Sequence, residues 1–262
     1  MRDKQRLGVL VSAALTLVLL LSLAVSLAAV PVEAHAPSGA GDPAEFEMDD
    51  IWIYDVDGGP LKISIDDAAG AHEGGLCPCV AAAFRVTQAA IGELWDLEEE
   101  YPSQGELLVT CRHPSKGYKD VFEYILTEGS CTFELPEGTS IENITMDNYV
   151  YTFTRTDTED ELNIQLNASV VPDGFFDIRY KVKGYDKGWH NDNPTGNERD
   201  TFVSKWSEFR DNLLTMEAWE LFDGIDEGVE EFPTAGVAFT GILACLLLLG
   251  GVYSLRGKVR RK

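Results

Sequence analysis

The side chains best suited to chemistry in this 262-residue chain are thiols and imidazoles in two short motifs. In the first, Cys77 and Cys79 are separated by one proline and directly precede a stretch of helical character; in the second, Cys111 is followed closely by His113. Thiolates and imidazoles are preferred ligands of Zn²⁺, and the N-terminus of a helix stabilises a thiolate. The first hypothesis is therefore a site for a divalent metal such as zinc. Its ligands would be Cys77, Cys79, Cys111 and His113, with His72 or Glu73 as a substitute.

Disulfide bonds are the alternative use of the same thiols. Four cysteines, an even number, lie between the apolar segments at the two chain ends: Cys77, Cys79, Cys111 and Cys131. Those segments indicate that this region is exported, and disulfides can form outside the cytoplasm. A bridge between Cys77 and Cys79 would close a very short, strained ring, so either one would pair more easily with Cys111 or Cys131. Both hypotheses stay open at this point.

Other motifs add little chemistry. Asn143 and Asn167 begin Asn-x-Thr and Asn-x-Ser acceptors for N-glycosylation, whereas Asn193 is followed by a blocking proline. The chain has no Gly-rich phosphate loop, no G-x-S-x-G elbow and no H-E-x-x-H motif. Hydrolase and nucleotide chemistry therefore have no support.

The elements that must position the thiols follow from hydrophobic periodicity. A helix is expected from about 80 to 99, directly after the first motif, and an amphipathic helix over 118–126 has apolar residues three and four positions apart. Strands are expected at 61–65, 106–110, 131–135, 149–155 and 161–166, of which the last two form a hairpin. The pattern predicts an α+β domain with a mixed sheet in the order α-β-α-β-β-β, covered by helices.

Two further helices are expected after the sheet. The first runs from about Asp173 to Gly184, and the second contains an aromatic stripe that includes Phe202, Trp206 and Phe209. Both should pack back on the domain.

The chain ends indicate export and a membrane anchor. An uncharged apolar segment at 7–30 follows a basic start, and a second apolar run at 235–253 precedes a basic tail, which the positive-inside rule places in the cytoplasm. The expected organisation is a signal peptide or signal anchor (1–34), a flexible linker (35–50), an extracellular domain (51–225), an acidic linker (226–234), a transmembrane helix (235–254) and a basic cytoplasmic tail (255–262).

The charge of the chain limits its partners. It carries 44 acidic and 21 basic Lys or Arg residues, for a net charge of −23. Such a field repels nucleic acid, so no nucleic-acid partner is expected. The expected partners are the membrane, through the C-terminal helix, and a second copy of the chain or another envelope protein.

Several segments in succession resemble the FmdE family, which is named after a component of formylmethanofuran dehydrogenase. They are "GLCPCVAAAFRVTQAAIGELW", "GELLVT", "DVFEYILTEGSCTFELPEG" and "NYVYTFTR", within a similarity that covers roughly residues 70–222. The resemblance implies an α-β-α-β-β-β fold and a metal-binding or thiol role. The segment "EFPTAG", the apolar run and the basic tail also resemble archaeal C-terminal sorting signals of the PEF-CTERM type.

The match departs from the family pattern at the site. The family shows H-G-H-x-C-P-G before the first helix, whereas this chain keeps the Cys-Pro pair at Cys77, loses both histidines from register and has Cys79 in place of the glycine. His72 lies one place away from the register of a family histidine, and Cys131 corresponds to a family cysteine. Two functions follow as hypotheses: a membrane-anchored metal-binding protein, or a non-catalytic envelope module held together by disulfides.

Overall fold

The structure is a computed structural model that describes residue 37 and residues 48–227. The predicted signal segment, transmembrane helix and basic tail lie outside these residues, as do nearly all of the two predicted linkers. Within residues 48–227, no helix is long and apolar enough to cross a membrane.

A five-stranded mixed sheet forms the centre of the domain, in the order β4-β3-β5-β6-β7. Its strands are β3 (Leu107–Cys111), β4 (Cys131–Phe133), β5 (Val150–Arg155), β6 (Glu161–Leu166) and β7 (Phe222–Asp223). β3 and β4 are parallel and the other neighbours are antiparallel, with Tyr151 opposite Ile164. The predicted α+β class and mixed sheet are confirmed.

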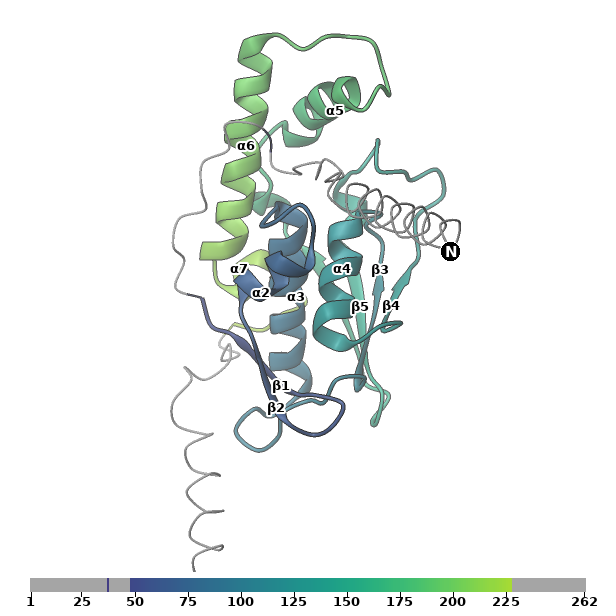
Figure 1. Cartoon of the computed structure of the whole chain (residues 1–262), viewed down its shortest axis with the longest axis vertical. Helices are drawn as coiled ribbons and strands as arrows, with labels where there is room; N and C mark the ends of the chain where they lie inside the picture. Colours follow the sequence, from purple (N-terminus) through teal and green to yellow (C-terminus); the bar gives the residue numbers. More distant parts are fainter. Residues whose placement is uncertain (1–36, 38–47, 228–262) are drawn as a thin grey trace, which may run out of the picture. The chain divides into compact units, whose positions relative to one another are not determined.

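Two helices that lie side by side cover one face of this sheet (Figure 1). α3 (Pro78–Leu94) begins at a proline, which is favourable in the first turn because its missing N–H would be unpaired there. Residues 80–91 of α3 are all buried, as expected of a helix packed between α4 and α6. α4 (Lys116–Leu126) is amphipathic, and Ser115 caps it by accepting a hydrogen bond from the N–H of Gly117. The start of α3 and the start of α4 are therefore fixed on a rigid scaffold.

A hairpin and a short helix precede α3. β1 (Ile51–Tyr54) pairs with β2 (Pro60–Ile63), and α2 (Ile65–Ala71) follows with a capping box at Ser64. The expected strand at 61–65 corresponds to β2. α2 was not predicted, because Ala68 is its one fully buried residue and gives no apolar periodicity.

The remaining helices return to the domain as expected. α5 (Phe175–Asp186) packs on α6 (Gly196–Thr215), and α6 packs on α3. Short elements complete the chain: η1 (Met146–Asn148), η2 (Ala168–Val170) and α7 (Ala218–Leu221). The first predicted helix was too long, because α3 ends at Leu94 and the acidic residues at 98–100 lie beyond it.

Candidate functional site

A pocket of about 480 Å³ opens where the start of α3 meets the loop after β3 and helices α5 and α6. Its polar lining includes both thiols of the first motif, His113 and several basic side chains. Much of the rest is aromatic, contributed by Tyr149, Phe175, Trp189, Phe202, Trp206 and Phe209. Pockets of this size and character are typical of small-molecule sites.

The Cys77 and Cys79 thiols lie at the N-terminal end of α3, and both residues line the pocket. The neighbouring Cys77 thiol lowers the pKa of Cys79 to about 7, against the effect of burial, and the Ser115 hydroxyl and the charge of Arg179 lower it further. The pKa of Cys77 is raised by its interaction with Cys79 and by burial. The pair therefore holds one proton readily and gives up the other near neutral pH, with the negative charge on Cys79.

His72 lies beside this pair and is held by a carboxylate. Its Nδ1 is 2.8 Å from Oδ2 of Asp120, which also pairs with Lys116 at 2.7 Å. A Cβ atom added to Gly117 would lie 3.1 Å from Cβ of Cys79 and 3.5 Å from Nε2 of His72, so both residues border the same small glycine. A carboxylate on one ring nitrogen is the usual support of a histidine that binds metal through the other.

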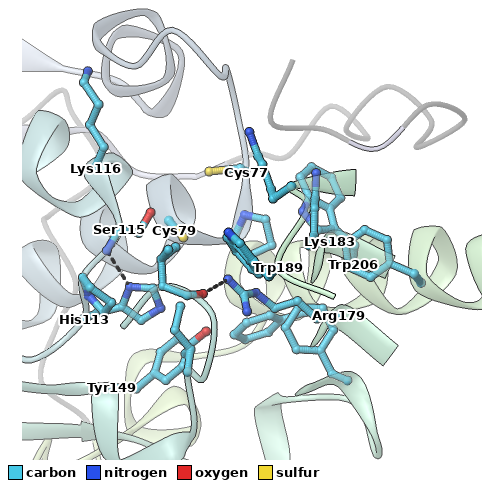
Figure 2. Close-up of a pocket in the computed structure, with 18 residues that line it drawn as sticks. Cys77, Cys79, His113, Ser115, Lys116, Tyr149, Arg179, Lys183, Trp189 and Trp206 are labelled. Atoms are coloured by element: carbon cyan, nitrogen blue, oxygen red, sulfur yellow. Dashed lines mark hydrogen bonds between the residues drawn. The ribbon is translucent and has the colours of Figure 1, made fainter. Parts of the chain in front are cut away.

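Cys111 and His113 reach the same region but have other partners. The Cys111 thiol is buried and accepts a hydrogen bond from the His113 N–H at 3.4 Å, and burial raises its pKa. Nδ1 of His113 accepts from the N–H of Ser115 at 3.2 Å, as the dashed line in Figure 2 shows. Burial, helped by Arg179, lowers the pKa of His113 to about 3, so the ring is neutral with its proton on Nε2. Neutral His113 can therefore donate a hydrogen bond from Nε2.

Cys131 lies apart from the pocket on the edge strand β4, where burial raises its pKa to about 12. All four described cysteines are free thiols, and the disulfide hypothesis stays a prediction. Within residues 48–227, no group of three or more His, Cys, Asp or Glu side chains is already arranged to hold a metal ion. The four-ligand metal site likewise stays a prediction.

The structure adds a basic face that the sequence did not lead us to expect. Arg179, Lys183 and Lys187 lie four residues apart along α5, on the face that borders the pocket. Figure 2 shows Arg179 and Lys183 across the pocket from His113. The four-residue spacing of these cations is the signal in the sequence that marks the face, alongside the end residues Asp173 and Gly184 that predicted the helix.

The two predicted glycosylation acceptors differ in exposure. Asn143 is exposed in a loop, although its amide donates to the carbonyl of Gly138 at 2.9 Å. Asn167 is half-buried, and its Oδ1 accepts from the Ser169 N–H at 3.0 Å. Of the two, Asn143 is the more accessible acceptor.

Comparison with known proteins adds no identification: no family model, curated protein or solved structure matches this chain. The resemblance to the FmdE family therefore stays an expectation from the sequence.

Proposed function

We propose that this protein binds a soft divalent metal ion such as zinc through the thiolates of Cys77 and Cys79. The observation that carries the proposal is the placement of both thiols at the N-terminus of α3, where they line the same pocket. The lowered pKa of Cys79 agrees with it. A metal that binds two thiols must displace their protons. When one of the thiols ionises near neutral pH, this deprotonation costs little free energy. The resemblance to the FmdE family supports the same residues, because Cys77 is the cysteine of its Cys-Pro pair.

His72 is the third protein ligand in this proposal, in place of His113. Its Nδ1 is 2.8 Å from Oδ2 of Asp120, and its Nε2 and Cβ of Cys79 both lie within 3.5 Å of the position that a Cβ atom on Gly117 would take. His113 would have to break its hydrogen bond with Ser115 and exchange its tautomer before Nε2 could bind a metal. Cys111 would have to give up a proton that burial retains.

Held by these residues, such an ion would supply Lewis-acid chemistry to a small ligand in the pocket. The chain's own residues would support this chemistry. Asp120 orients His72, and Ser115 and Arg179 stabilise the Cys79 thiolate. The aromatic residues that line the pocket exclude water. We propose further that the apolar run at 235–254 anchors the protein in the cell membrane, with this domain outside.

Metal content and free thiols of the full chain test the proposal. Protein purified anaerobically in detergent should contain about one zinc per chain, and Cys77→Ser and Cys79→Ser should abolish it. Cys131→Ser is the matched control, because it removes a thiol outside the pocket and should leave the metal bound. Metal-free protein whose thiols react only after reduction would refute the proposal and support the disulfide-held envelope module instead.

A further inference from the structure

The geometry points to a second property of this pocket: it binds a small organic anion with a flat apolar body, such as an aromatic carboxylic acid. The inference rests on the pocket's walls and needs no metal. It therefore goes beyond the proposed function and can hold or fail independently of it.

The cations of α5 provide the first argument. Arg179 is half-buried and donates to the carbonyl of Ile141 at 2.8 Å, and within residues 48–227 it forms no ion pair with a carboxylate. Its side chain lines the pocket, across from His113 (Figure 2). Two other cations nearby, in contrast, form ion pairs with carboxylates: Lys181 pairs with Glu198, and Arg199 pairs with Asp186 at 2.9 Å. The positive charge of Arg179 is therefore available to an acidic group that enters the pocket.

The polar groups inside the pocket are mostly donors. Neutral His113 carries its proton on Nε2, and burial raises the pKa of Tyr149 so that its hydroxyl keeps its proton. Arg179 and Lys183 add charged donors. The Cys79 sulfur is a weak acceptor in the same lining. Such a lining favours a ligand that accepts hydrogen bonds and carries negative charge.

The apolar wall defines the rest of the ligand. Phe175 stacks on Phe202 with ring centroids 6.4 Å apart and packs edge-on against Phe209 at 5.2 Å. Lys183 Nζ lies 5.8 Å from the centre of the Phe202 ring, so a cation adjoins the aromatic surface. A flat ring against this wall would place an attached acidic group among the α5 cations.

The acidity of the whole chain does not oppose this binding. Its net charge of −23 acts through solvent, where salt screens charges over about 8–10 Å at physiological ionic strength. Within a partly desolvated pocket, the nearby cations outweigh distant surface acids. The acidic surface should instead slow the entry of multiply charged anions, which favours a monoanion.

A pair of probes with the same ring system tests the inference. Binding of 2-naphthoate and of uncharged 2-naphthalenemethanol is measured by calorimetry on the full chain in detergent, with chelator and reductant so that the protein holds no metal. We expect the naphthoate to bind at least about tenfold more tightly, because a charged hydrogen bond contributes that much. Arg179→Met should reduce the affinity for naphthoate toward that of the alcohol and leave the affinity for the alcohol unchanged.

Lys119→Met is the matched control, because it removes one charge from the exposed face of α4 and should change neither affinity. Lys183→Met, which should reduce the preference for naphthoate, provides the same test if Arg179→Met does not fold. Equal affinity for the two probes, no binding of either, or an undiminished preference in both folded α5 variants would overturn the inference. A zinc result of either sign leaves this outcome unaffected, because the probes are measured on metal-free protein.

Discussion

At the scale of single residues, the chemistry of the site depends on how one proton is shared between Cys77 and Cys79. The Cys77 thiol and the Ser115 hydroxyl favour a thiolate on Cys79, while burial opposes it. At neighbouring Cys111, burial is the largest influence on the pKa and keeps the thiol protonated. The same residue type is therefore reactive at one position and inert at the other.

Alkylation of Cys79 should follow an ionisation near pH 7. Because the thiolate is the nucleophile, the rate with iodoacetamide should rise as pH increases through about 7 and level off above it. Cys77→Ser replaces the S–H donor with a hydroxyl, so the alkylation rate should still rise near pH 7. Cys77→Ala removes the donor and should move the rise in rate to higher pH. The alkylation rate of Cys79 is measured by mass spectrometry at a series of pH values. A rise centred near the ordinary thiol pKa in the unchanged protein would contradict the assignment.

The two histidines should differ in their effect on metal affinity. His72→Ala removes a proposed ligand and should weaken zinc binding by more than the about 10- to 100-fold that loss of an outer-shell partner costs. His113→Ala removes a buried ring that contacts Tyr118 and Tyr149 at centroid distances of 4.5 and 4.8 Å, so it should lower thermal stability with a smaller effect on zinc. Competition with a chromophoric chelator gives both affinities. The reverse order of effects would identify His113 as the ligand.

At the scale of elements, the close approach of α3 and α4 builds the site. Gly117, in the first turn of α4, lets Cys79 and His72 come together because it has no side chain. A proline starts α3 immediately after Cys77, which fixes that residue as the cap of the helix. The spacing of the thiols is thus set by two helix starts.

Gly117→Ala should disturb the site while leaving the helices intact. The added Cβ would lie 3.1 Å from Cβ of Cys79, so Cys79 must move by a few tenths of an ångström. Alanine favours helix over glycine by about 1 kcal/mol, so the fold should not suffer. Zinc affinity should fall by on the order of tenfold through the altered ligand geometry.

Gly196→Ala is the control, because it also lies in the first turn of a helix and nothing is within 4 Å of its added Cβ. Equal zinc affinities of the two variants would show that the contact at Gly117 does not shape the site.

At the scale of the whole molecule, the C-terminal helices convert a thiol pair on a sheet-and-helix core into a pocket. α6 packs on α3 and carries α5 with it, so residues about 100 positions after Cys79 form the opposite wall. The predicted anchor would hold this pocket at the outer surface of the membrane. The thiols, cations and aromatic wall belong to one domain but to segments far apart in sequence.

Orientation in the membrane can be tested with a tag placed after Lys262. Protease added to intact cells should digest the domain and leave the tag protected, because the basic tail is expected inside. Lysed cells provide the control, in which the tag should also be digested. An intact domain on intact cells, with digestion only after lysis, would place the domain inside.

The parts of the fold that the sequence predicted are those with long, regular apolar patterns. The helix at 118–126 and the hairpin strands show clear periodicity, and they correspond to α4, β5 and β6. α2, α7 and β7 are too short for periodicity to reveal them. In the site, the thiols could be recognised by type, but Phe202, Trp206 and Phe209 matched a core stripe. Only tertiary packing shows that the same rings line a pocket.

X-ray absorption spectroscopy at the zinc edge tests the central proposal most directly. On the zinc-loaded full chain, we predict a first shell with two sulfur ligands, together with nitrogen or oxygen ligands that include one imidazole. Cys131→Ser should leave this spectrum unchanged. Cys79→Ser should not retain zinc on purification, and zinc added back to it should have fewer sulfur ligands. A first shell without sulfur, or one unaffected by the Cys79 substitution, would contradict a metal site at Cys77 and Cys79.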